Sequence, residues 1–327
     1  MSSSASQPEI KRVEDLWFPD ATLILRAENS LFRVHSGILA ARSSVFRDMI
    51  AFPQPTPTKD SGENETVDGH VVVRLHDLAG EVEVFLRAIF DSSFFMPPRS
   101  PVEFHVVIGV MRLAHKYDVQ YLFQRALSHL DSMFQVQFAD FLAMDWGAAK
   151  DKDHVVFQSG DITVDFSKAF RAALEVGALW LLPTAYYNIV RESDFLVQLG
   201  ANCYLSPQEE KLFLAAQIKC LRAFVSTHRF MKLLPSPDCD SLQCTDTITE
   251  GHDVLKRWSD DCADMDPLGP WVFGFVDGTL CDGCEELARG KHRAAQEVFW
   301  DTLPTLFGLP TWDELRELRC KVIEETA

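Results

Sequence analysis

The chain has 327 residues, of which 47% are hydrophobic and 24% charged, a balance typical of a folded protein. Its length predicts two domains, or two domains and a small additional segment. The formal net charge of −17 opposes the approach of phosphate backbones and anionic lipids, so we expect neither a nucleic-acid nor a membrane partner. The densest basic runs, HKYDVQYLFQR and RGKHR, are interpreted as solvated helix faces. The longest apolar stretch, VGALWLLPTAYY, is too short to span a membrane and contains Pro183.

The N-terminal run MSSSASQPEIKRVEDLW lacks the apolar core of a signal peptide, and residues 1–14 are predicted to form a flexible tail. The eight cysteines are therefore expected in a reducing compartment, cytoplasmic and/or nuclear. In such a compartment disulfides are rare, and thiols are either buried or bound to metal.

Residues 15–131 predict strands and helices in a mixed order. TLILRAENSLFRV has two apolar runs around a polar turn, which predicts a two-stranded hairpin. SGILAARSSVFRDMI predicts two short helices, N-capped by Ser36 and by Ser43 or Ser44. Their apolar positions at helical spacing are Ile38, Leu39, Val45, Phe46, Met49 and Ile50.

The rest of this region alternates a loop, a strand and helices. The Pro-, Thr- and acid-rich segment from Pro53 to His70 predicts a flexible surface loop, because its composition buries little apolar surface. VVVRLHDL predicts a third strand. Amphipathic helices follow in EVEVFLRAIFDS, VEFHVVIGVMRLAHKYDV and VQYLFQRALSHL.

This order of elements, together with a set of short motifs, resembles the BTB/POZ fold. The resemblance implies an α+β module over residues 15–131, a small sheet capped by helices, in which His35, Phe46 and Tyr117 are structural. It also implies protein–protein association, by self-dimerisation or by docking of a partner, which in one large branch of the family is a cullin-type ubiquitin ligase scaffold. The matching positions are Asp20, His35, Leu39, Ala40, Ser43 or Ser44, Val45 and Phe46, and then Leu113, Ala114, Lys116, Tyr117, Val119 and Leu122.

Residues 132–234 are predicted to be mainly helical. HVVFQSGDITVDF has two β-favouring runs around a turn and predicts a small hairpin, and SKAFRAALEVGALWLL predicts a helix that ends at Pro183. LSPQEEKLFLAAQIKCLRAF begins with a capping box of Ser206 and Glu209, and its apolar stripe predicts that Cys220 is buried. This region resembles the helical extension that follows the BTB module in many fungal proteins.

Residues 235–327 are predicted to form a C-terminal helical segment, and they contain two cysteine pairs. PDCDSLQCTD contains Cys239 and Cys244, and LCDGCEEL contains Cys281 and Cys284. A C-x-x-C turn directs two sulfurs at one tetrahedral centre, and a second pair completes a four-sulfur zinc site. Cys262 and His252, which lie between the pairs, are candidate substitutes for a ligand.

Other interpretations of these cysteines remain open. They are ordinary reduced thiols in loops if the pairs do not converge, and the acidic neighbours Asp238, Asp240 and Asp282 count against thiolate formation. A redox C-x-x-C is the third interpretation, although no βαβ pattern surrounds it.

The sequence contains no H-E-x-x-H, no G-x-S-x-G and no H-x-E beside the C-x-x-C, and we expect no enzymatic activity. We therefore predict an interaction protein whose BTB/POZ-like domain binds protein partners, as a homodimer or as an adaptor for a ubiquitin ligase scaffold. Structural zinc is the candidate cofactor, and no other cofactor is expected. The rival prediction is a zinc-containing transcriptional or chromatin regulator, against which the negative charge counts.

Overall fold

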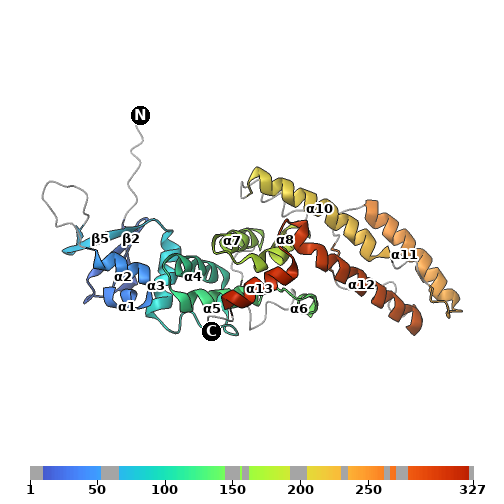
Figure 1. The fold of residues 1–327 in the computed structure, drawn as a ribbon, viewed down its shortest axis with the longest axis horizontal. Helices are drawn as coiled ribbons and strands as arrows, with labels where there is room; N and C mark the ends of the chain where they lie inside the picture. Colours follow the sequence, from blue (N-terminus) through green and yellow to red (C-terminus); the bar gives the residue numbers. More distant parts are fainter. Residues whose placement is uncertain are drawn as a thin grey trace, which may run out of the picture. The chain divides into compact units, whose positions relative to one another are not determined.

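The computed structural model describes the chain in two compact units (Figure 1). The N-terminal unit contains residues up to Met133 together with 150–158, and the helical unit contains 134–149 and 159–327. The described residues are 10–52, 66–143, 155–156, 162–191, 205–229, 235–260, 266–269 and 279–323.

A five-stranded sheet with the order β1-β3-β2-β5-β4 forms one layer of the N-terminal unit. Its centre is the predicted hairpin, in which β2 and β3 pair antiparallel with Leu25 opposite Phe32, and the turn places Glu28 at a φ of +48°. β1 adds to β3 and β5 adds to β2, both in parallel register. The strands are β1 (Lys11–Trp17), β2 (Leu23–Ala27), β3 (Ser30–Val34), β4 (Thr66–Val67) and β5 (His70–Leu75).

Two expectations for this unit need correction. Residues 11–14, assigned to the flexible tail, belong to β1, in which Val13 and Leu16 are buried. Thr66–Val67 and His70, assigned to the flexible loop, form the β4–β5 hairpin, whereas residues 53–65 lie outside the described part of the chain. Both strands were missed because pairing with existing strands, rather than an alternating apolar pattern of their own, stabilises them.

Helices cover the sheet and carry most of the buried apolar side chains of this unit. α3 and α4 approach closely at Gly109, where a Cβ atom would lie 2.9 Å from Cγ2 of Val84. The helices are α1 (Ser36–Arg42), α2 (Ser44–Ala51), α3 (Ala79–Phe90), α4 (Phe104–Lys116) and α5 (Gln120–Asp131).

The two predicted motifs of this unit contact each other. Ser43 caps α2 by accepting the N–H of Phe46 (3.0 Å), and its hydroxyl donates to the carbonyl of Tyr117. The Ser44 hydroxyl donates to the carboxylate of Asp118, and the rings of Phe46 and Tyr117 stack with centroids 4.6 Å apart. The serine-rich helix start and the K-Y-D turn are thus the two halves of one packing arrangement.

The apolar positions of α1 and α2 divide between core and surface. Leu39 and Phe46 are fully buried, as their spacing predicts. Ile38 and Val45 were assigned to the same apolar set, but the structure leaves them 42% and 40% exposed. The difference arises because each helix has only two turns, so a window this short does not define which apolar residue faces the sheet.

The helical unit was predicted correctly in its class but not in all its boundaries. The hairpin predicted in HVVFQSGDITVDF is wrong. β7 (Val155–Val156) belongs to the N-terminal unit and pairs there in parallel with β6 (Val102–Glu103), and α7 (Ile162–Glu175) of the helical unit begins within the second run. Pro183 does not end α7. The helix ends at Glu175, Gly177 has a φ of +74°, and Pro183 lies in the first turn of α8, where its missing N–H is tolerated.

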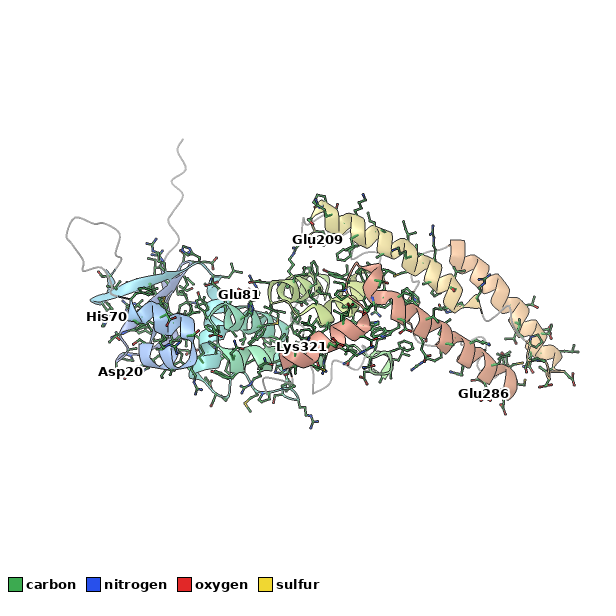
Figure 2. The ribbon with its side chains drawn as sticks, in the orientation of Figure 1. Asp20, His70, Glu81, Glu209, Glu286 and Lys321 are labelled. Atoms are coloured by element: carbon green, nitrogen blue, oxygen red, sulfur yellow. The ribbon has the colours of Figure 1, made fainter. Side chains whose placement is uncertain are left out.

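α10 begins with the predicted capping box, in which Glu209 accepts the N–H of Ser206 (2.7 Å); Glu209 is labelled at this helix end in Figure 2. Cys220 is buried on this helix, as predicted. α10 contacts both α8 and α12. The remaining elements are α6 (Phe138–Ala143), a 3₁₀ turn (Leu179–Leu181), α8 (Leu182–Arg191), α10 (Pro207–Thr227), α11 (Leu242–Asp260), α12 (Asp282–Leu306) and α13 (Trp312–Ile323).

Candidate functional site

The structure brings the four predicted cysteines together at the starts of α11 and α12. Their sulfur atoms all lie within 4.8 Å of one another, and the sulfurs of Cys239 and Cys281 are 3.7 Å apart, although these residues are separated by 42 positions in the chain. All four are free thiols. We call Cys239, Cys244, Cys281 and Cys284 the cysteine cluster.

Two helix N-termini position these sulfurs. Cys281 is the N-cap residue of α12 and Cys284 lies in its first turn, so the C-x-x-C spacing places both sulfurs at the same helix end. Cys244 occupies the matching place in α11, where its N–H donates to the hydroxyl of Ser241 (3.4 Å). The positive end of a helix dipole favours thiolates, so both helices stabilise negative charge at this point.

Backbone donors also point at the buried sulfurs. The N–H of Cys281 donates to the sulfur of Cys244 (3.2 Å), and the N–H of Ser236 donates to the sulfur of Cys284 (3.3 Å). Burial raises the pKa of Cys244, but the N–H of Cys281 and the hydroxyl of Ser241 outweigh it and lower this pKa to about 7. Burial raises the pKa of Cys284 to about 12. Sulfurs this close do not all carry negative charge without a cation that offsets their repulsion.

Four thiols around one point are a donor set for a soft metal ion. Cys244 and Cys284 are fully buried, whereas Cys239 and Cys281 remain partly accessible to solvent. With four protein ligands a tetrahedral ion has no open position for substrate, so the arrangement suits a structural role and not a catalytic one.

The other cysteines and the candidate substitute ligands do not join the described cluster. Cys320 is exposed on α13, and Cys220 is buried on α10. Cys262 and Cys203 lie outside the described residues, and His252 lies in α11 without a described side chain.

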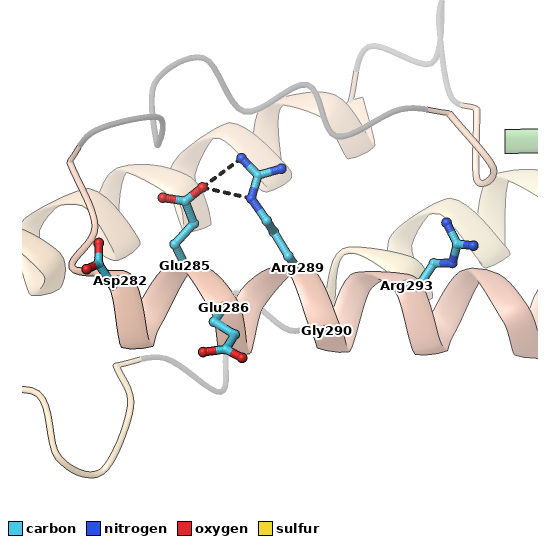
Figure 3. A pocket seen from close by; sticks show the side chains of 6 residues that line it. All are labelled: Asp282, Glu285, Glu286, Arg289, Gly290 and Arg293. Atoms are coloured by element: carbon cyan, nitrogen blue, oxygen red, sulfur yellow. Dashed lines mark hydrogen bonds and ion pairs between the residues drawn. The ribbon is translucent and has the colours of Figure 1, made fainter. Parts of the chain in front are cut away.

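A pocket of about 620 Å³ lies along α12, next to the cysteine cluster in sequence. Glu285 and Arg289 form an i,i+4 ion pair (2.7 Å), and Arg293 pairs with Glu297 (3.4 Å). Such pairs are typical of a solvated helix face, which agrees with the interpretation of the basic run RGKHR. The lining residues are Asp282, Glu285, Glu286, Arg289, Gly290 and Arg293 (Figure 3).

His292, within the same basic run, is buried, which the interpretation of that run as a solvated helix face does not predict. Its ring lies 5.0 Å from that of His228, between centroids. Burial lowers the pKa of both histidines, that of His292 to about 4, so both are neutral at pH 7. The signal that was overlooked is its i,i+4 spacing from two other buried residues of α12, Ala288 and Gln296.

The N-terminal unit presents apolar side chains to solvent on three helices. Ile38 on α1, Val45 on α2 and Tyr121 on α5 are exposed, and the guanidinium of Arg42 lies over the ring of Tyr121 at 5.3 Å. We call Ile38, Val45 and Tyr121 the exposed apolar set. Exposed apolar residues of this kind are candidates for protein contacts. His35, in contrast, has local neighbours: its Nε2 lies 3.6 Å from the carboxylate of Asp20.

Comparison with known families identifies the N-terminal unit. Residues 14–133 match the BTB/POZ domain family, and no curated protein matches the chain. The chain thus has an N-terminal BTB/POZ domain, with a curled sheet and helices, followed by a mainly helical region. BTB/POZ domains are generally interaction modules rather than enzymes. Among the described residues, no helix has both the length and the apolar character that crossing a membrane requires.

Proposed function

We propose that the chain is a non-enzymatic interaction protein whose BTB/POZ domain binds a protein partner. The observation that carries this proposal is the family match over residues 14–133, which coincides with a folded α+β unit. The free thiols of the helical unit suit a reducing compartment, the cytoplasm or the nucleus.

The partner surface that we propose contains the exposed apolar set on α1, α2 and α5. A homodimer places these side chains against the same set of a second copy, and an adaptor places them against a ubiquitin ligase scaffold of the cullin type. In the adaptor form, the helical unit selects the protein that is brought to the scaffold. Either way, apolar area is removed from water at residues that the fold itself does not need to bury.

A charge-introducing variant tests this surface. Ile38→Glu combined with Val45→Glu is expected to abolish self-association or partner capture, because two carboxylates would be desolvated in the contact. The measurement is sedimentation of the purified chain, together with affinity capture of a cullin-type scaffold. Leu214→Glu is the matched control, since Leu214 is 53% exposed on α10 of the other unit. If the double variant and the control bind equally well, the proposed surface is wrong.

The cysteine cluster favours a second candidate function, a zinc-containing transcriptional or chromatin regulator. Such a protein needs basic residues beside the metal, but Asp238, Asp240 and Asp282 are the exposed charges next to the cysteines. With the net charge of −17, we expect no salt-dependent binding to duplex DNA near physiological ionic strength. A sub-micromolar complex that weakens as salt rises would favour the regulator over the adaptor.

A further inference from the structure

We propose that the cysteine cluster binds one Zn²⁺ ion, and that this ion joins the start of α11 to the start of α12. Nothing in the BTB/POZ match assigns such a site, because all four cysteines lie after residue 133.

The first argument is geometric. Four sulfurs at about 2.3 Å from one Zn²⁺ ion in a tetrahedron are separated by about 3.8 Å from each other. The observed separation between Cys239 and Cys281 is 3.7 Å, and no pair in the cluster exceeds 4.8 Å. A cluster of two or more metal ions divides its ligands between ions and needs wider separations. The spacing therefore fits a single ion.

The second argument concerns the donors. Thiolates are soft ligands, and a closed tetrahedron of four sulfurs is a characteristic structural site for Zn²⁺. One divalent ion with four thiolates carries two surplus negative charges. The N–H groups of Cys281 and Ser236, each directed at a buried sulfur, and the two helix N-termini offset that charge.

The third argument concerns what else holds α11 in place. Over residues 242–251, where its side chains are described, α11 buries Cys244, Thr247, Ile248 and Gly251, so Ile248 is its one large buried apolar side chain there. Leu242, at its start, is 82% exposed.

α12, in contrast, is held by a long row of buried side chains. They are Cys284, Ala288, His292, Gln296, Phe299, Trp300, Leu303, Pro304 and Leu306. α12 thus packs along its length, whereas the described turns of α11 depend on the sulfur end. The proposed ion adds an attachment to the described first turns of α11, which bury only one large apolar side chain.

The first test is metal content. The full chain, purified without chelator, is expected to contain one zinc ion per molecule by elemental analysis, and exchange with Co²⁺ is expected to give the absorption of tetrahedral cobalt thiolate. Cys284→Ser is expected to lose the metal. Cys320→Ser, which removes an exposed thiol on α13, is the matched control and is expected to keep it. Iron in place of zinc, or the absence of any metal, would overturn the site.

The second test separates docking from binding. Hydrogen exchange of the zinc-loaded chain is compared before and after chelation, and α11 is expected to exchange roughly tenfold faster or more without zinc, while α13 and the BTB/POZ helices stay protected. Ile248→Ala is expected to keep both zinc and the protection of α11. If zinc binds but chelation leaves α11 unchanged, the site stands and the docking role is wrong.

A conservative variant distinguishes the loss of a zinc ligand from a general failure of the chain to fold. Cys239→His leaves four ligands of a kind that structural zinc sites use, and it is expected to retain zinc with α11 protected. Cys239→Ala, which offers no ligand, is expected to lose zinc. One zinc ion per molecule retained by Cys239→Ala with an intact fold would mean that Cys239 is not a ligand, and the four-sulfur site would be wrong.

Discussion

The BTB/POZ domain and the end of the helical unit hold distant parts of the chain together by different means. In the domain, Phe46 stacks on Tyr117, both rings are buried, and the Tyr117 hydroxyl donates to Asp77 (2.6 Å). At the starts of α11 and α12, sulfur atoms converge instead, and the buried side chains among the described residues there are those of Cys244, Leu280 and Cys284. The contrast teaches that stability of the domain resides in packing, whereas stability around the cysteines depends on the chemical state of four thiols.

The largest effect that sharpens this comparison is expected from Phe46→Ala. Removing a fully buried ring that stacks on Tyr117 costs about 3–5 kcal/mol of the free energy of unfolding of the domain. The decrease in the free energy of unfolding is measured by denaturant titration, with hydrogen exchange of α4 as the local readout. The zinc content of the chain is expected to stay unchanged. Phe52→Ala is the matched control, because Phe52 is 70% exposed and its loss is expected to change stability by less than about 0.5 kcal/mol. Equal effects of the two variants would contradict the packing account.

Acidification is expected to affect the helical unit next. The native pKa of His292 is about 4 against an ordinary value of 6.5, because the ring is buried. Between pH 6.5 and 4, His292 is protonated in the unfolded chain but remains neutral in the native chain. The free energy of unfolding therefore decreases as the pH falls through this range, by up to about 3 kcal/mol from this group. Above pH 6.5 this contribution is constant.

The control for acidification is His292→Gln, which is expected to flatten the pH dependence of unfolding of the helical unit. Zinc content is followed in both proteins, because thiolates also release metal in acid. His129 in the domain and His228 in the helical unit have pKa values lowered by burial as well, so a residual slope is expected in both units. An unchanged slope in the variant would mean that His292 is protonated without unfolding.

The smallest effect is expected from Ser206→Ala. This variant removes the N-cap of α10, where the Ser206 hydroxyl accepts the N–H of Glu209 (3.3 Å), and the expected loss is about 1 kcal/mol. Faster exchange confined to the first turn of α10 and a small fall in the unfolding midpoint are the measurements. Ser226→Ala, at an exposed position of the same helix, is the matched control. A larger loss from Ser226 than from Ser206 would contradict the capping account.

The sequence allowed the domain to be predicted because its motifs are the residues that contact each other. Ser43 precedes α2 and Ser44 is its first residue, Tyr117 and Asp118 follow α4, and hydrogen bonds join the two pairs in the structure. Strands β1 and β4 escaped prediction because their partner strands, and not their own residues, define them.

Local spacing in the sequence predicts one half of the cysteine cluster, the pair Cys281 and Cys284, but it leaves open whether the other pair lies beside it. The C-x-x-C spacing predicts that Cys281 and Cys284 share a helix end, but the approach of Cys239 and Cys244 depends on where the fold places the start of α11 relative to the start of α12. No local pattern encodes that placement. His292 illustrates the opposite error, since its charged neighbours Lys291 and Arg293 concealed its place on the buried face of α12.

Because α3 and α4 approach closely, the residues allowed at positions 84 and 109 depend on each other. Because a Cβ at position 109 would stand 2.9 Å from Cγ2 of Val84, the volume that the two side chains share is already filled. A larger residue at 109 is tolerated only with a smaller one at 84, so the effects of the two changes do not add. In an evolving sequence or a designed library, residues 84 and 109 are therefore best treated as a single choice.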